Sequence, residues 1–221
     1  MPVTDSRALR ARIIGIAREM NGLGINRGKS GNVSARTDAG FLITPSALPY
    51  DETKPEDIVA VDRDGNAAGR HAPSSEWRFH RDIYAARAEA AAIVHTHAPF
   101  ATTLACLDRG IPAFHYMIAV AGGSDIRCAA YATFGTQALS DHAVRALEGR
   151  HACLLSHHGM IAIGASLKTA LALAVEVETL AEMYWRALLI GEPRSLSQDE
   201  MRAVLDKFDG YSQLTTTRSR R

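Results

Sequence analysis

One short stretch decides the fold class and the candidate site: residues 91–97 read Ala-Ala-Ile-Val-His-Thr-His. Its first four residues are apolar, which predicts a strand buried within a sheet. Side chains at positions i and i+2 of a strand point to the same side. His95 and His97 are therefore predicted to converge on one point where this strand ends.

A second histidine group follows another apolar run. Residues 153–155 predict a strand, and His157-His158-Gly159 comes directly after it. Three histidines that leave a fourth position open form the pattern of catalytic zinc, although imidazole also suits other divalent ions. The spacing does not choose between His157 and His158, and the alternative is that all these histidines are hydrogen-bonded polar residues at strand ends. Surface or packing roles are expected for the other five, which are His71, His80, His115, His142 and His151.

Helical and extended patterns alternate along the chain. A first helix, capped by Thr4 or Asp5, is predicted from the spacing of apolar residues between Leu9 and Met20. A hairpin is expected over residues 31–44 and a third strand over 58–61. Further helices are predicted over 76–88, 98–107, 137–148 and 166–191, and Ser197 and Glu200 form a capping box for a last one. The pattern predicts one α/β domain over residues 1–214, followed by a polar tail over 215–221 that we expect to be disordered.

Composition excludes several classes of protein. Hydrophobic residues make up 47% of the 221 residues and charged residues 22%, which is not the composition of a disordered chain. A formal net charge of +1 gives no overall field that would attract nucleic acid or an anionic membrane. The N-terminus has no apolar leader segment, so we expect a cytoplasmic protein. Three cysteines without C-x-x-C spacing indicate buried free thiols and not a disulfide framework.

Two further segments suggest anion chemistry. Glu76 follows Ser74-Ser75 at a predicted helix start, where free amides and the helix dipole stabilise a carboxylate or a bound phosphate. The alternative is an ordinary glutamate of a first helical turn. Gly28-Lys29-Ser30 is not a P-loop, because Leu23 stands at the required glycine position. This glycine-rich segment with Asn32 and Ser34 either holds a phosphate monoester or is a plain loop.

Six ordered blocks, considered together, resemble the class II aldolase/adducin family, and within it the L-fuculose-1-phosphate aldolases. The resemblance extends from the first helix to Tyr211, and because the histidines and Glu76 are all present, it favours the catalytic branch over the adducins. The blocks are Gly31-Asn32-Val33-Ser34, Thr44 to Tyr50, Pro73 to His80, His95-Thr96-His97, His115 to Ala119, and His157-His158-Gly159.

The resemblance implies an α/β fold around a largely antiparallel sheet and a homotetramer with active sites between subunits. It implies zinc, with Mn²⁺ or Co²⁺ as alternatives, and reversible cleavage of a ketose 1-phosphate to dihydroxyacetone phosphate and an aldehyde. It implies that His95, His97 and His158 hold the metal, that Glu76 is the base, and that Tyr116 and Tyr211 are catalytic tyrosines reaching a site at least partly from a neighbouring subunit. The implied substrate-phosphate positions are Gly31, Asn32, Ser46, Ala47, Ser74 and Ser75. Before substrate arrives, Glu76 can itself occupy the open metal position.

Two departures from the family pattern leave the substrate open. Ala47 stands where the aldolases have a glycine, and Lys29 replaces a small polar residue in the loop over 28–32. L-fuculose 1-phosphate therefore competes with 5-deoxy and 5-methylthio ketose 1-phosphates as the substrate. The alternative activity is that of a metal-dependent dehydratase, decarboxylase or 4-epimerase of the same family. The non-enzymatic alternative is a scaffold protein without bound metal.

Overall fold

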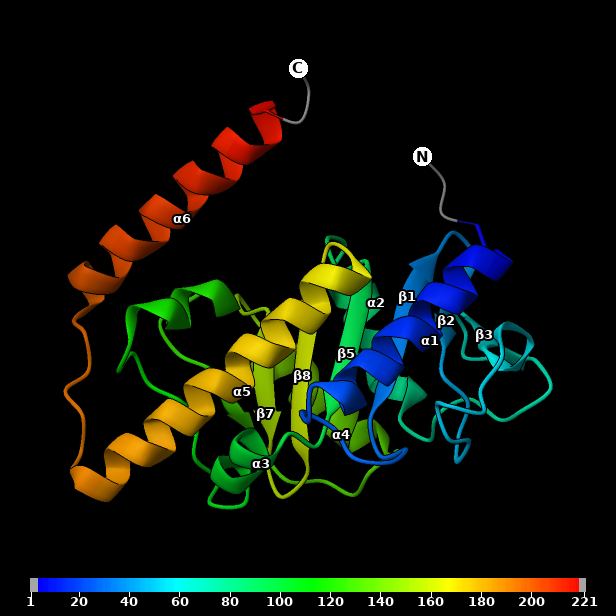
Figure 1. Ribbon diagram of the computed structural model, residues 1–221, viewed down its shortest axis with the longest axis horizontal. Coiled ribbons are helices and arrows are strands. Elements are labelled where there is room, and N and C mark those ends of the chain that lie inside the picture. The colour runs from blue at the N-terminus through cyan, green and yellow to red at the C-terminus, as the bar shows by residue number, and fades with distance from the viewer. Residues whose placement is uncertain (1–3, 219–221) are drawn as a thin grey trace.

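An eight-stranded sheet forms the centre of the structure, with strand order β4-β3-β2-β1-β5-β8-β7-β6 (Figure 1). The computed structural model describes residues 4–218, and the side chains of residues 4–208. Every neighbouring pair of strands is antiparallel except β6 and β7, which confirms the predicted α/β fold around a largely antiparallel sheet. The strands are β1 (Asn32–Thr37), β2 (Gly40–Ile43), β3 (Val59–Asp62), β4 (Ala67–Ala68), β5 (Ala92–Thr96), β6 (Cys128–Ala129), β7 (Ala152–Leu155) and β8 (Gly159–Gly164).

Helices cover both faces of this sheet. On one face lie α1 (Arg7–Gly22), α3 (Pro99–Ala105) and α5 (Leu167–Ile190), and on the other α2 (Trp77–Ala86) and α4 (Gln137–Ala146) (Figure 1). Side chains of β5 alternate between the two cores, with Val94 in the first and Ile93 in the second. Burial on both faces is the reason that the first three residues of β5 are apolar.

The register between β1 and β5 positions the site. Asn32 lies opposite His95, and Ser34 lies opposite Ile93. His95 shares its side of the strand with Ile93, whose core cluster includes residues of α2. The polar end of β5 therefore meets the start of α2 and the first residue of β1.

Several details differ from the sequence predictions. The N-cap of α1 is Ser6, whose Oγ accepts a hydrogen bond from the Leu9 amide, and neither Thr4 nor Asp5 has this role. The two-residue strands β4 and β6 were not predicted, because so short a segment carries no periodicity. Two short 3₁₀ helices, η1 (Pro55–Asp57) and η2 (Tyr116–Ala121), were not predicted either. Cys106 is exposed and not buried, while Cys153 is buried as expected; the cysteines are free thiols.

The last helix is α6 (Gln198–Arg218). Its first part packs on the core through Met201 and Val204, and its remainder extends away from the rest of the molecule (Figure 1). Its predicted capping box is confirmed, since the Ser197 amide donates to Glu200 Oε2 and the Glu200 amide donates to Ser197 Oγ. Residues 215–218 of the expected disordered tail are helical, and 219–221 lie outside the described residues. Within the described part of the chain, no helix has the length and apolar character needed to cross a bilayer.

Candidate active site

Three histidine rings meet at one end of the central strands. His95 is near the end of β5, His97 follows that strand, and His158 directly precedes β8. Their ring centroids are 4.9 to 5.0 Å apart, and each pair of rings is inclined by 71 to 80°. The rings thus converge edge to face around a common point, as the strand geometry predicts for His95 and His97.

Glu76 joins the histidines from the start of α2, where it is the N-cap residue. Its Oε2 lies 3.1 Å from His95 Nε2, and its Oε1 lies 3.0 Å from His158 Nε2. The four side chains each place one potential ligand atom within 4.8 Å of the others. Three imidazoles and one carboxylate form a donor set suited to a divalent transition metal ion.

The protonation of His95 supports the fit of a cation. Its Nδ1 lies 2.9 Å from the carbonyl oxygen of Met160, and only an N–H can satisfy a carbonyl oxygen. In the neutral ring, Nε2 is then an unprotonated acceptor that faces the Glu76 carboxylate and lies 3.2 Å from His97 Nε2. Such lone pairs repel unless a proton or a cation lies between them, so the donor set fits a metal ion. The hydrogen bond to Met160 is the kind of outer-shell contact that orients a metal-binding histidine.

Electrostatics in the cluster favour an ionised Glu76. Burial raises the pKa of this carboxyl, but His95 and His158 outweigh burial and hold the pKa well below its usual range. Burial together with His95 and His158 lowers the pKa of His97 to about 4. Burial lowers the pKa of His95, but Glu76 outweighs burial and raises this pKa. A bound metal ion would displace the proton from this ring, because an ionised carboxylate and a neutral imidazole are the forms that bind metal.

The turn between β7 and β8 distinguishes the two adjacent histidines. His157 has a φ of +53°, a left-handed conformation that is uncommon for residues other than glycine. Its side chain is 52% exposed and its ring contacts Tyr131, so His158 is the one that enters the cluster. Gly159 has no room for a side chain, because a Cβ there would lie 2.6 Å from the Thr96 carbonyl oxygen.

Three loops that carry implied phosphate positions meet beside Glu76. Asn32 Nδ2 lies 3.0 Å from Ser74 Oγ and 3.0 Å from Glu76 Oε2. A Cβ on Gly31 would lie 2.5 Å from the His95 carbonyl oxygen, so only glycine allows this approach of the two strands. Two backbone hydrogen bonds join the loop that contains Ser46 to the loop that contains Ser74. The Ser46 amide donates to the Ala72 carbonyl oxygen, and the Ser74 amide donates to the Thr44 carbonyl oxygen.

A cavity of about 370 Å³ opens onto this cluster. Its lining includes the polar side chains of Lys29, Ser30 and Ser75 and the exposed aromatic side chains of Tyr131 and Phe134. Glu76, His97, Ala132, His157 and His158 complete the lining. The cavity therefore offers cationic, hydroxyl and aromatic groups beside the histidines.

The two family departures lie next to each other. Ala47 has a φ of +61°, a conformation that glycine adopts without strain. The Lys29 ammonium donates a hydrogen bond to the Ala47 carbonyl oxygen over 2.9 Å. Lys29, one of the two departures from the family pattern, thus supports the loop that contains Ala47, the other departure.

Of the two implied tyrosines, the structure describes the side chain of Tyr116, which is not brought to the histidines. Tyr116 begins η2, is 51% exposed, and does not line the cavity at the histidines. Tyr211 falls within α6, and its side chain lies outside the described residues.

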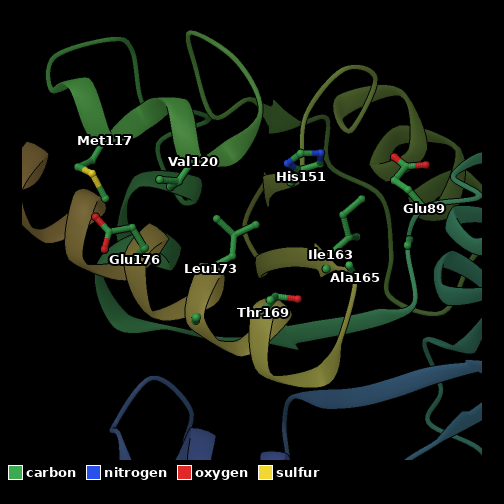
Figure 2. A pocket seen from close by; sticks show the side chains of 12 residues that line it. Glu89, Met117, Val120, His151, Ile163, Ala165, Thr169, Leu173 and Glu176 are labelled. Atoms are coloured by element: carbon green, nitrogen blue, oxygen red, sulfur yellow. The ribbon is translucent and has the colours of Figure 1, made fainter. Parts of the chain in front are cut away.

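A separate cavity of about 660 Å³ lies between η2 and α5 (Figure 2). Met117, Val120, Ile163 and Leu173 give it an apolar lining, with Glu89, His151 and Glu176 among the other side chains around it. It shares no lining residue with the cavity at the histidines. Because four ligating atoms converge at the histidines, we assign the chemistry to the smaller cavity.

A surface or packing role was expected for His80, but the structure connects it to the residues beside Glu76. It is fully buried, and its ring nitrogens contact Asn32 Oδ1 and Ser34 Oγ. Burial, with a smaller effect of His95, lowers its pKa to about 3, so the ring is neutral. The spacing from Glu76 to His80 places both on one face of a helix, which was the available signal.

Comparisons with known proteins agree with this site. Residues 11–185 match the family described as Class II Aldolase and Adducin N-terminal domain. The chain is 60% identical over 204 residues to a 5-methylthioribulose-1-phosphate/5-deoxyribulose-1-phosphate aldolase of Rhodospirillum rubrum, covering 92% of each chain. It is 49% identical over 208 residues to an L-fuculose phosphate aldolase of Escherichia coli K12, covering 94% of this chain and 97% of that one.

A solved structure described as L-fuculose 1-phosphate aldolase superimposes with a TM-score of 0.90 at 40% identity, covering 92% of this chain and 97% of that chain. The shared fold and the match to the family model lead to the same assignment. The chain belongs to the class II aldolase and adducin family.

Proposed function

We propose that the protein is a zinc-dependent class II aldolase that reversibly cleaves a ketose 1-phosphate to dihydroxyacetone phosphate and an aldehyde. The observation that carries the proposal is the convergence of Glu76 with His95, His97 and His158 beside a cavity whose lining includes Lys29, Ser30 and Ser75. Relatives named as aldolases of such sugar phosphates support the reaction class. Zinc held by the three histidines, or Mn²⁺ or Co²⁺ in its place, would polarise the substrate carbonyl as a Lewis acid.

Proton transfer in this scheme belongs to Glu76 and a tyrosine. In cleavage, the C4 hydroxyl loses its proton, the C3–C4 bond breaks with its electron pair left on the C3 fragment, and C3 then gains a proton. Glu76, held ionised at the end of the cavity, is placed to exchange the proton at C3. A tyrosine hydroxyl, from Tyr116 or Tyr211, serves the aldehyde oxygen.

The phosphate belongs at the polar side chains of the cavity. Gly31, Asn32, Ser46, Ala47, Ser74 and Ser75 are the proposed positions, and the joined loops supply backbone amides and hydroxyls for a phosphate dianion. Lys29 adds a positive charge to the lining.

The aldehyde end belongs against the aromatic side chains of the cavity. Tyr131 and Phe134 are 61% and 65% exposed, and an apolar surface of this kind favours a substrate that ends in a methyl or methylthio group. L-fuculose 1-phosphate and the 5-deoxy and 5-methylthio pentulose 1-phosphates all end in this way. The relative that is 60% identical is named for the 5-methylthio and 5-deoxy substrates.

We also propose a cytoplasmic homotetramer with active sites at subunit interfaces. The exposed Tyr116 does not line the histidine cavity of its own chain, so it is available to a neighbouring one. The extended α6, which carries Tyr211, and the open apolar cavity beside η2 fit subunit contacts as well (Figures 1 and 2).

The test is a side-by-side assay of zinc-loaded protein with L-fuculose 1-phosphate and 5-deoxyribulose 1-phosphate. A coupled dehydrogenase follows dihydroxyacetone phosphate, and a chelator is the control. Release from either substrate that the chelator abolishes is the expected result. No release from both, with zinc bound, would refute the aldolase and favour the dehydratase, decarboxylase or epimerase activities.

A matched variant tests the role of Glu76. Glu76→Gln keeps the shape of the side chain but removes the base, so turnover should fall by about 10²- to 10⁴-fold. Zinc content should stay at the wild-type level because the three histidines remain. Full activity in this variant would exclude Glu76 from proton transfer.

A further inference from the structure

A continuous hydrogen-bonded chain runs behind Glu76, on the side away from the cavity. It joins Tyr84, Ser34, His80, Asn32 and Glu76 in that order. The separations are 2.7 Å from Tyr84 Oη to Ser34 Oγ, 2.7 Å from Ser34 Oγ to His80 Nδ1, 2.5 Å from His80 Nε2 to Asn32 Oδ1, and 3.0 Å from Asn32 Nδ2 to Glu76 Oε2.

Each member of this chain is buried. Ser34 and His80 are fully inaccessible, and the exposed fractions of Asn32 and Tyr84 are 1% and 6%. Buried polar groups must find their partners within the protein. The direction of each hydrogen bond in the chain is therefore set by the neighbouring groups.

The carboxylate fixes these directions. A carboxylate only accepts hydrogen bonds, so the Asn32 NH₂ must face Glu76 and the Asn32 carbonyl oxygen must face His80. His80 Nε2 then carries the proton that is donated to this oxygen. In the neutral ring Nδ1 accepts from the Ser34 hydroxyl, whose oxygen accepts from Tyr84.

We propose that His80, as its Nε2–H tautomer, is a positioning residue that locks the Asn32 amide in the one orientation that donates to Glu76. The inference rests on the proposed function, in which Glu76 moves a proton. Without the donor at His80 Nε2, the Asn32 amide can rotate and turn its oxygen toward the carboxylate. Glu76 would then face a repelling lone pair in place of an N–H.

The kinetic test compares His80→Phe with His80→Gln. Phenylalanine keeps an aromatic ring beside Phe79 and Phe41 but removes both ring nitrogens. We expect kcat to fall by about 10- to 100-fold, the usual loss when an outer-shell partner is removed, with the larger part of the loss in kcat and less in KM. Glutamine retains an amide donor near Nε2, so His80→Gln should recover most of the activity. Equal loss in both variants would contradict the proposal.

A double-mutant cycle separates positioning from simple packing. In an Asn32→Leu background no amide remains to be oriented, so His80→Phe should cause no further loss of kcat. If the kcat losses of the two single variants multiply in the double variant, His80 acts independently of Asn32 and the proposal is wrong. Ile83→Ala, in the same helix and equally buried, is the matched control and should lower the melting temperature without changing kcat.

A spectroscopic measurement tests the hydrogen-bond order without reference to activity. In ¹⁵N NMR of zinc-loaded protein labelled at the histidine ring nitrogens, we expect the His80 ring to have Nε2 protonated and Nδ1 unprotonated throughout pH 6 to 8. The signal should be absent from His80→Phe, which assigns it. A proton on Nδ1 of His80 would overturn the proposal. An inactive wild-type protein would refute the proposed function, and the NMR result would still decide the order of the chain.

Discussion

At the scale of single residues, the adjacent histidines before Gly159 offer a sharp test of the metal site. His158 belongs to the cluster, whereas His157 has a left-handed backbone and a half-exposed side chain. His158→Ala should weaken zinc binding by more than about 100-fold, since loss of an outer-shell partner alone costs 10- to 100-fold. His157→Ala, the matched control, should retain zinc. Metal analysis after dialysis measures both, and loss of zinc from His157→Ala alone would contradict the assignment.

The backbone at Ala47 makes a prediction about stability. The left-handed backbone at Ala47, with a φ of +61°, lowers the free energy of unfolding by about 1–2 kcal/mol because of its Cβ. Glycine would remove this strain, but its greater freedom in the unfolded chain would lower the free energy of unfolding by about 0.5–1 kcal/mol. Ala47→Gly should therefore raise the free energy of unfolding by about 0.5–1 kcal/mol in urea titrations. Gly149→Ala is the reciprocal control, because Gly149 has a φ of +64° with nothing within 4 Å, and it should be destabilising. A stability loss in Ala47→Gly would refute the strain argument.

At the scale of elements, the contact between α2 and α4 depends on one carboxylate. Asp82 of α2 accepts hydrogen bonds from Ser140 and Gln137 of α4, each over 2.6 Å, and from Arg81 over 2.7 Å. Burial raises the pKa of Asp82, but Arg81, Ser140 and Gln137 outweigh burial and hold the pKa below its ordinary value.

A pH dependence of stability follows from this depressed pKa. Because the folded-state pKa lies below the unfolded one, the contribution is present above about pH 4 and is lost as pH falls through the folded-state pKa. Asp82→Asn should cost about 1–2 kcal/mol in free energy of unfolding at pH 7 and less at pH 3. Urea titrations at both pH values measure this, with Asp51→Asn in an exposed loop as the control. An equal cost at both pH values would contradict the account.

The elements that the sequence predicted well are those with strong local signals. The hairpin over 31–44, the buried β5 and the long α5 from Ser166 to Gly191 all have clear periodicity or caps. The strands β4 and β6 were missed because two residues carry no pattern and pair only through tertiary contacts. The contacts of His80 could not be predicted either, because its partners Asn32 and Ser34 are more than 40 positions away in the sequence.

The candidate site could be predicted in part from strand geometry. The i and i+2 positions of His95 and His97 are a local property, whereas the choice of His158 over His157 depends on a turn conformation that the residue types do not reveal. The contact of Glu76 with His95 and His158 depends on how α2 packs on the sheet. The resemblance to the family supplied what the spacing left open.

At the scale of the whole molecule, the sheet brings four distant regions to one cavity. The loop before β1, the start of α2 and the ends of β5 and β7 meet there, so each supplies one part of the proposed chemistry. The proposed phosphate positions, the metal ligands and the base come from elements that are far apart in the sequence and meet only through tertiary packing. The central claim is therefore that these parts form one metal-dependent lyase site.

The most direct measurement of that claim is a zinc titration of metal-free protein, with metal content and dihydroxyacetone phosphate release measured on the same samples. The substrate is the ketose 1-phosphate that gives the faster release with the fully loaded protein, or both sugars if neither is cleaved. Activity should rise in proportion to bound zinc and reach its plateau at one ion per chain. Zinc that binds at one ion per chain without any release of dihydroxyacetone phosphate from either ketose 1-phosphate would contradict the account.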